Sequence, residues 1–497
     1  MADDEAPIEA ARGVAEARRL FELQHKASRR GDPVRAETRR DRLGRLRALV
    51  ADNEAMFTAA ISNDFGVRSR TETELLELVP ALNAIRHARK KLAYWMRPER
   101  RRIAPTFQPA KAWVRHEPLG VIGIISPWNY PLLLALSPLV DAIAAGNCAM
   151  LKPSELTPAF SALLKRLVSE HFDEAEVAVV TGGAEVGAAF SGLRFDHLLF
   201  TGSTEIGIKV YQAAAANLTP VTLELGGKSP AVVCPDYSLD KAARSIAFGK
   251  FINAGQTCIA PDYVLVPASR AAAFAEQVMS EARRAYPRIA GNDDYSAVIS
   301  ERHFERLDRA IAGARAAGAT VLTHEDEGAR EERKIGPTVI LNAQEETIFL
   351  SEEIFGPVLP IVPYERLEDA IAFIAARGRP LALYCFSGRK AHQQRVLDAV
   401  LSGGVTLNGT LLHFAQENLP FGGVGRSGIG AYHGQEGFRR FSHIRAVHKV
   451  GFFNAFERIG PPWGKLSSIV GRLMARSART RSPKQGRRRA SAGQATD

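Results

Sequence analysis

The segment Asn-Ala-Gly-Gln-Thr-Cys, residues 253–258, is the first place where this sequence could carry chemistry. Its last residue, Cys258, is a candidate nucleophile, because a thiolate that is reachable and stabilised is reactive. The small residues before it leave room for a substrate to approach. The alternative is a buried thiol without a chemical role, since free cysteine is among the most buried residue types. The cysteine alone leaves both interpretations open.

Two other segments carry groups with chemical potential. Glu224 stands between leucines ahead of a glycine pair, and such an apolar frame can raise the pKa of a carboxyl toward that of a general base. Residues 202–207, Gly-Ser-Thr-Glu-Ile-Gly, follow an expected strand and open an expected helix, where glycines let the backbone approach a phosphate. Because this is not the GxGxxG fingerprint, an ordinary strand-to-helix turn remains the alternative.

The elements that must position these groups alternate between strand and helix. Short apolar runs at 119–125 and 147–152 predict strands buried on both faces, and they end in the turns 126–131 and 152–155. We expect mainly helices over residues 8–100, with one amphipathic helix over 39–57. The remaining strands are expected at 112–116, 178–183, 197–200, 231–234, 262–266 and 358–363, and the remaining helices at 132–146, from 157 onward, and at 239–253, 269–286 and 302–317. This alternation predicts a doubly wound α/β protein.

Length and composition limit the class of protein. A chain of 497 residues is too long for one hydrophobic core, so two or three domains are expected. Four cysteines, at positions 148, 234, 258 and 385, are too few and too scattered for a disulfide scaffold or a metal knuckle, and we expect no metal site. We also find no secretory signal and no long uncharged apolar run. These features predict a protein of a reducing compartment, the cytoplasm.

Together these segments resemble the aldehyde dehydrogenase superfamily. Asn129 precedes Glu224 by 95 positions and Glu224 precedes Cys258 by 34, and both spacings are similar to those of the class 3 branch. The resemblance covers about residues 15–450. Within the branch, Thr410-Leu-Leu-His413 with Ala415-Gln416 resembles bacterial coniferyl aldehyde dehydrogenases. Other runs that carry the likeness are residues 194–203, 218–230, 255–264, 419–425, 430–434 and 441–443.

The resemblance implies an aldehyde dehydrogenase-like fold and a domain plan. The implied fold has a Rossmann-type cofactor domain, an α/β catalytic domain and a β-strand oligomerisation arm. The resemblance also implies a homodimer. The expected parts are N-terminal helices of the cofactor domain (1–102), an oligomerisation hairpin (103–118), the NAD(P)-binding domain (119–224), the catalytic domain (225–417), a C-terminal return to the cofactor domain and arm (418–450), and a basic tail (451–497).

The resemblance also implies the reaction. Cys258 would add to an aldehyde, and the Asn129 amide with the backbone N–H of Cys258 would stabilise the oxyanion. Hydride loss to the nicotinamide leaves a thioester, which water activated by Glu224 would hydrolyse. The implied substrate is an aromatic aldehyde, such as coniferyl aldehyde, or a medium-chain aliphatic one.

The implied cofactor is NAD, with NADP possible. Ser203 would lie near the pyrophosphate, and Lys152 and Glu155 near the adenosine ribose, with Trp128 nearby. Glu353 would lie on the nicotinamide ribose and Phe355 beside the nicotinamide. Singly, such residues are more often core aromatics or surface charges. Glu155 should repel a 2′-phosphate, yet the class 3 branch tolerates both cofactors. The full set is Trp128, Lys152, Glu155, Gly202, Ser203, Gly207, Glu353 and Phe355.

Other functions stay open on the residues alone. A cysteine-dependent ester or thioester hydrolase would use the same three groups but needs no dinucleotide, and a silent homologue would not need all three. From Lys465 to Asp497, nine basic residues stand against one acid, a net charge of +8. Apolar residues at 466, 469, 470, 473 and 474 form a helical stripe. The tail could lie on a membrane surface, as in a fatty aldehyde dehydrogenase, or stay disordered without a partner. Arg487–Arg489 could touch nucleic acid, but no base-reading module accompanies them.

Overall fold

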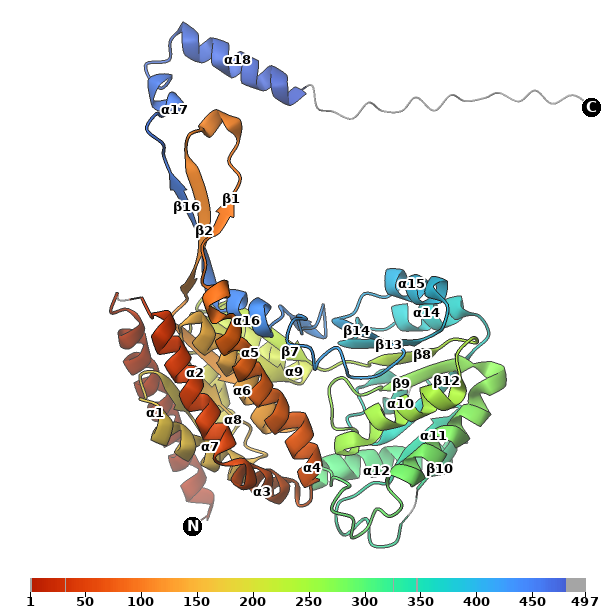
Figure 1. Cartoon of the computed structure of the whole chain (residues 1–497). Coiled ribbons are helices and arrows are strands. Elements are labelled where there is room, and N and C mark those ends of the chain that lie inside the picture. The colour runs from red at the N-terminus through yellow and green to blue at the C-terminus, as the bar shows by residue number, and fades with distance from the viewer. Residues whose placement is uncertain (1, 32, 325, 346, 480–497) are drawn as a thin grey trace, which may run out of the picture. The chain divides into compact units, whose positions relative to one another are not determined.

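The computed structural model describes residues 2–31, 33–324, 326–345 and 347–479 (Figure 1). The chain divides into two compact units. The first contains residues 1–97 and 116–444, and the second contains residues 98–115 and 445–497. Within the described residues, no helix combines the length and the apolar character needed to cross a bilayer.

A six-stranded sheet forms the first half of the larger unit (Figure 1). All neighbouring strands are parallel except β15, which pairs antiparallel with β7. Its strands are largely buried, as near-continuous apolar runs predict for a parallel sheet covered on both faces. In spatial order they are β15 (Gly428–Ile429), β7 (Val221–Leu225), β6 (His197–Gly202), β3 (Val121–Ile125), β4 (Cys148–Lys152) and β5 (Val177–Val179).

Helices cover both faces of this sheet, because successive strand residues point to opposite sides. Val121 and Leu198 pack with α1 (Ala2–Ser28), α8 (Ala184–Ser191) and α9 (Thr204–Ala215). Ile122 and Leu199 face the cluster that contains the other helices. These are α2 (Ala36–Ala51), α3 (Glu54–Phe65), α5 (Val79–Trp95), α6 (Pro131–Ala145) and α7 (Pro158–His171).

One expected helix is wrong as a single element. The predicted helix over 39–57 is broken at Asp52 and Asn53, where α2 ends and α3 begins. The side chains of Asp and Asn compete with the helical backbone for hydrogen bonds, which favours helix ends over interiors. A further irregularity lies before α5, where α4 (Arg70–Thr73) continues into a π-helical turn, Glu74–Leu78.

A seven-stranded sheet forms the second half of the larger unit. It is parallel except at β10, which pairs antiparallel with β11. In spatial order its strands are β10 (Thr320–Thr323), β11 (Thr338–Leu341), β12 (Val358–Tyr364), β9 (Tyr263–Pro267), β8 (Pro230–Val233), β13 (Ala382–Phe386) and β14 (Gly404–Leu407). The accompanying helices are α10 (Leu239–Phe251), α11 (Ala271–Ala285), α12 (Glu301–Ala316), α13 (Ile348–Ser351), α14 (Leu367–Ala375) and α15 (Lys390–Ala399), whereas α16 (Gly434–Arg440) packs on α5 and α6 of the first half. The predicted α/β class is confirmed.

The smaller unit is built around a three-stranded sheet of β1 (Glu99–Arg101), β2 (Lys111–Pro118) and β16 (Ser442–Lys449). The strand expected at 112–116 lies within β2. Farther along the chain are α17 (Ala455–Arg458) and α18 (Lys465–Arg479). The helical stripe predicted in the tail is confirmed, since Leu466, Ile469 and Leu473 are exposed along α18. Residues 487–489 lie outside the described residues.

Candidate active site

The carboxyl edge of the six-stranded sheet gathers most of the predicted site residues. Because β3, β4, β6 and β7 are parallel, their carboxyl ends lie at one edge. Asn129 follows β3, Lys152 ends β4, Gly202 ends β6, and Glu224 is the penultimate residue of β7. In open α/β sheets, ligands bind in the crevice outside this edge. The sheet therefore brings together groups that are far apart in the sequence.

The loop that carries Cys258 has an unusual backbone. After α10, Asn253 and Ala254 adopt left-handed conformations with φ of 50° and 49°, which asparagine tolerates better than most residues. A side chain at Gly255 would overlap the carbonyl oxygen of Gly356, so glycine is required there. The buried Gln256 amide holds the loop by donating to the carbonyls of Asn253 and Ala297 and accepting from a backbone N–H. The loop is thus fixed by contacts distant in sequence.

The Cys258 thiol is half-buried at the end of this loop, whereas the other three cysteines are buried. Burial raises its pKa to about 12, and the nearby Glu353 and Glu224 carboxylates raise it as well. The backbone N–H groups of Cys258 and Ile259 oppose this rise in pKa. The thiol is therefore protonated at neutral pH, and it needs a proton acceptor or a change in nearby charge to become a nucleophile.

The Glu224 carboxyl is buried, and neither of its oxygens has a hydrogen-bond partner among the described residues. Burial raises its pKa well above the ordinary value, and the Arg440 charge only partly opposes this. A buried polar atom without a partner is costly, so its presence needs an explanation. One explanation is that this carboxyl exchanges protons with a thiol or a water during a reaction.

Asn129 lies against the cysteine loop. Its side-chain amide donates to the carbonyl of Gln256 at 3.1 Å. An amide nitrogen carries two hydrogens, so one hydrogen remains for a second acceptor. Gln256 stands two residues before Cys258. The hydrogen bond to its carbonyl therefore brings the Asn129 amide close to the thiol, as an oxyanion donor requires.

The residues expected to hold the adenosine end of the cofactor form one cluster. Buried Lys152 donates to Glu155 at 2.8 Å. Glu155 lines a pocket of about 650 Å³ whose rim includes Gly182 and Gly183. A Cβ at Gly183 would meet no atom within 4 Å among the described residues, so the rim is open to a ligand. The pocket fits a ribose and its neighbouring groups.

The turn at 202–207 has the features of a phosphate-binding helix start. The Ser203 side chain caps α9 by accepting from the Ile206 N–H at 3.4 Å. A side chain at Gly207 would overlap Leu225, so glycine allows α9 to pack closely on β7. Backbone N–H groups at such a helix start favour an anion. These residues fit a pyrophosphate.

Glu353 and Phe355, expected near the nicotinamide, lie in a second cluster. This cluster also contains Trp128, which was expected near the adenosine ribose. Trp128 and Phe355 pack edge to face, with ring centroids 5.3 Å apart. The Glu353 carboxylate lies against the backbone of Gly226, because a Cβ there would overlap it. Burial and the Asp262 charge raise its pKa to about 8, although the Gly227 N–H opposes this. Glu353 thus lies within electrostatic reach of Cys258.

Sequence reasoning overlooked two residues that support this cluster. The Lys228 ammonium contacts the Asp262 carboxylate and donates to the carbonyls of Phe349 and Glu352, both at 2.7 Å. Asp262 also accepts from the N–H of Ile354 at 3.0 Å. This pair holds the loop on which Glu353 lies. The sequence held a signal for them, because Lys228 lies in the run 218–230 and Asp262 in the run 255–264, both of which resemble the family.

Among the described residues, one group has the donor types of a metal site: Cys234, Asp236 and His392. Its carboxylate is already engaged, since Asp236 accepts from Ser387 Oγ, from the Gly388 N–H and from His392 Nδ1. These bonds organise the turn before α15. We therefore interpret the group as structural.

Comparisons with known proteins identify the family. The model described as "Aldehyde dehydrogenase family" matches residues 8–447. The "Probable coniferyl aldehyde dehydrogenase" of Pseudomonas aeruginosa is 49% identical over 432 residues, 87% of this chain and 90% of that protein. The "Aldehyde dehydrogenase, dimeric NADP-preferring" of Canis lupus familiaris is 39% identical over 407 residues, 81% of this chain and 87% of that protein.

Solved structures give the same answer. The substrate-bound AldH of Staphylococcus aureus has a TM-score of 0.86 at 37% identity, covering 92% of this chain and 99% of that one. The Mycobacterium tuberculosis aldehyde dehydrogenase complexed with NAD+ has a TM-score of 0.79 at 28% identity, covering 89% of this chain and 92% of that one. The predicted family, the fold and the use of NAD or NADP are confirmed, and a hydrolase is not favoured. The chain belongs to the aldehyde dehydrogenase family and oxidises an aldehyde to the carboxylic acid.

Proposed function

We propose that the substrate is an aromatic aldehyde of the coniferyl type, with medium-chain aliphatic aldehydes as the alternative. The named Pseudomonas relative supports this choice. So does a group of rings near the end of the catalytic region, where Phe414 packs edge to face on Phe421 and His433. His413, in the motif that carries the likeness to coniferyl aldehyde dehydrogenases, is buried and shares a hydrogen bond with Thr406. Phe414 is therefore the better candidate for substrate contact.

The observation that carries the mechanism is the meeting of a half-exposed thiol, an amide donor and a partnerless buried carboxyl. Cys258 attacks the carbonyl carbon as a thiolate, after its proton has passed to solvent, and the resulting oxyanion accepts hydrogen bonds from the Asn129 amide and the Cys258 N–H. The bound dinucleotide supplies the acceptor for the hydride that the adduct loses. Glu224 then takes a proton from the water that hydrolyses the thioester, releasing the acid and the thiol.

Most cofactor residues keep their proposed roles: Lys152 and Glu155 at the adenosine ribose, Gly202, Ser203 and Gly207 at the pyrophosphate, and Glu353 and Phe355 near the nicotinamide. Trp128 packs on Phe355, which supports a place near the nicotinamide instead of the adenosine ribose. Buried Lys152 and its partner Glu155 support an NAD preference, because the Glu155 carboxylate would face a 2′-phosphate. The dog relative's name supports use of NADP as well.

The domain boundaries given above and a cytoplasmic homodimer are also proposals. The compact smaller unit around the β1–β2–β16 sheet supports a separate arm, and the dog relative's name supports a dimer. Sedimentation equilibrium checks this. A mass near 54.1 kDa, that of one chain, at micromolar concentration would contradict the dimer.

We further propose that the tail makes weak contact with anionic membranes. Leu466, Ile469 and Leu473 are exposed on α18, and the segment from residue 465 onward carries a net +8. Each basic residue near such a surface contributes about 1 kcal/mol, less at high salt. Sedimentation with anionic vesicles should pellet the full chain at low salt more than a chain ending at residue 459. Equal pelleting would contradict the proposal, and fatty aldehyde oxidation at a membrane would lose its support.

A panel of aldehydes tests the proposed substrate class. We expect higher kcat/KM for cinnamaldehyde-type substrates than for succinic semialdehyde, measured through formation of the reduced cofactor with NAD and NADP in turn. A Phe414→Ala variant should raise KM for aromatic substrates, whereas Leu412→Ala, at an exposed position, serves as the control. A preference for the small charged semialdehyde contradicts the proposal.

A further inference from the structure

We propose that Arg68, paired with buried Glu77, is a positioning residue that fixes the turn of Asn129 and thereby aims its amide at the reacting oxygen. The inference rests on the proposed role of Asn129 as an oxyanion donor. It adds one residue from the loop between α3 and α4 and one from the π-helical turn before α5 to a site whose reacting groups all come from later segments.

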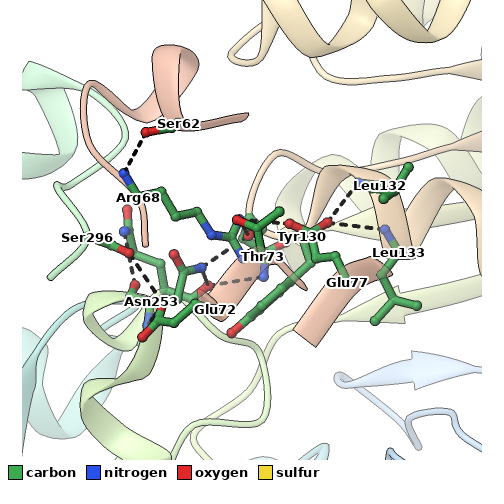
Figure 2. A network of polar contacts seen from close by, with 12 residues as sticks. Ser62, Arg68, Glu72, Thr73, Glu77, Tyr130, Leu132, Leu133, Asn253 and Ser296 are labelled. Carbon is green, nitrogen blue, oxygen red and sulfur yellow. Dashed lines mark hydrogen bonds and ion pairs between the residues drawn. The ribbon is translucent and has the colours of Figure 1, made fainter. Parts of the chain in front are cut away.

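Arg68 makes the central contacts of a buried polar network (Figure 2). Its side chain is fully buried, and Nη1 donates to the main-chain carbonyl of Asn129 at 2.9 Å. The same nitrogen lies 3.0 Å from Glu77 Oε1. The guanidinium lies over the rings of Phe65 and Tyr130, with centroid distances of 5.0 and 4.9 Å. The ion pair and the two rings therefore fix the arginine side chain, which in turn donates a hydrogen bond to the Asn129 carbonyl.

Glu77 holds the other side of the same turn. Its second oxygen, Oε2, accepts the N–H groups of Leu132 and Leu133 at 2.8 and 3.2 Å, in the first turn of α6. These N–H groups have no partner within the helix, and a carboxylate there is favoured. Glu77 lies in the π-helical turn before α5, a local widening that often occurs at functional sites. The ion pair thus holds the Asn129 turn at both of its ends.

The network continues into the loop that carries Cys258. Asn253 Nδ2 donates to the Asn129 carbonyl at 3.1 Å, so this oxygen accepts from both Asn253 and Arg68. The Asn129 amide donates to the Gln256 carbonyl, and Tyr130 Oη shares a hydrogen bond of 2.7 Å with Thr257 Oγ1. The two halves of the oxyanion site, the Asn129 amide and the Cys258 loop, are therefore tied together by short buried bonds.

Stability alone is a weak reason for such a pair. Removing two charges from water is costly, and well-packed apolar residues of similar volume are often at least as stabilising. An apolar pair, however, cannot bind the Asn129 carbonyl or the first N–H groups of α6. Catalytic donors must keep their geometry to within a fraction of an ångström, and a small displacement of a donor lowers the rate. Positioning explains why the charges are retained.

The test measures the pre-steady-state burst of reduced cofactor in variants of the Arg68–Glu77 pair. Arg68→Met/Glu77→Gln removes both charges of the pair together, and the new side-chain amide oxygen can still accept from α6. We expect the burst rate to fall at least tenfold, toward the roughly 10²-fold cost of losing one oxyanion donor. The dissociation constant for NAD should stay within twofold. Arg68→Lys, which keeps the charge, should recover part of the rate.

Arg39→Met is a matched control. Arg39 is also buried, and it donates to the Ala144 carbonyl at the far end of α6 and to Val34, remote from Asn129. It should lower the melting temperature without changing the burst rate. If the burst rates of Arg39→Met and Arg68→Met/Glu77→Gln fall equally, the effect is structural and the proposal is overturned.

A cycle with Asn129→Ala separates the possible failures. If Arg68 acts through Asn129, adding the double substitution to Asn129→Ala should slow the burst less than twofold further. A slow Asn129→Ala enzyme combined with a normal burst in the double variant overturns the role of Arg68 alone. A normal burst in Asn129→Ala overturns the oxyanion role of Asn129, and the positioning role falls with it.

Discussion

The two clusters of the active site are built in different ways. The adenosine and pyrophosphate cluster stands where regular strands end and regular helices begin, with Ser203 capping α9 and Lys152 ending β4. The reacting cluster depends on irregular backbone, since Asn253 and Ala254 are left-handed and Gln256 is tied to residues about 40 positions later. Binding features can follow from local patterns, whereas the thiol and its helpers require contacts made only in the folded chain. Substitutions should therefore separate binding from chemistry.

Cys258→Ala should give the largest separation between cofactor binding and chemistry. We expect turnover to fall by about 10³-fold or more, because no other group can form the covalent adduct. The dissociation constants for NAD and NADP, measured by fluorescence titration, should change little. Cys148→Ala is the control, since that thiol is buried in β4, and it should keep its activity. Near-normal turnover of Cys258→Ala would falsify the assignment.

Glu224→Gln should separate the two steps of the reaction, hydride transfer and thioester hydrolysis. The amide keeps the shape of the carboxyl but cannot take a proton, so thioester hydrolysis should slow by roughly 10²-fold or more. Rapid mixing should show a burst of reduced cofactor followed by a slow steady state. If burst and steady state fall together, Glu224 acts on Cys258 and not on water, and the assignment of the second step is wrong.

The contrast between the clusters also explains what the sequence could predict. Buried strands and turn positions follow from local patterns. The local pattern made Cys258 and Glu224 candidates only, and the family resemblance gave them their expected roles. The break at Asp52 and Asn53 was missed because the apolar spacing continues across it. Arg68 and Glu77 could not be found, because charged residues usually face solvent, and only the tertiary structure shows these two buried. Glu353 was expected on the cofactor alone, and its closeness to Cys258 is a result of the fold.

That closeness predicts a smaller, pH-dependent effect. Glu353 has a pKa raised to about 8, so its carboxylate is charged above that pH and then repels the Cys258 thiolate. In Glu353→Gln this repulsion is absent, so the pKa of Cys258 should fall below about 12. The rate of alkylation by iodoacetamide should therefore rise at lower pH than in the unsubstituted enzyme, with the difference growing above about pH 8. Glu352→Gln, at an exposed neighbour, is the control. Coincident profiles would show that Glu353 does not act on the thiol.

The smallest effect is expected in the binding cluster, from Glu155→Gln. The carboxylate is half-exposed, and its bond to Lys152 holds that ammonium away from any added phosphate. Removing the charge both relieves repulsion of a 2′-phosphate and frees Lys152 to attract it. For a half-exposed charge this is worth roughly 1 kcal/mol, or about fivefold in KM for NADP.

The comparison of the two clusters requires that this change leave the chemistry untouched. The burst rate at saturating cofactor should equal that of the unsubstituted enzyme with either dinucleotide, and KM for NAD should change by less than the KM for NADP. Glu185→Gln on the first turn of α8 is the control, because Glu185 is exposed and does not line the pocket. Raising the ionic strength should shrink the difference between the two cofactors, since the interaction is between charges near solvent. An unchanged NADP-to-NAD ratio of kcat/KM in Glu155→Gln would place the adenosine ribose elsewhere along the sheet edge and remove Lys152 and Glu155 from the cofactor site.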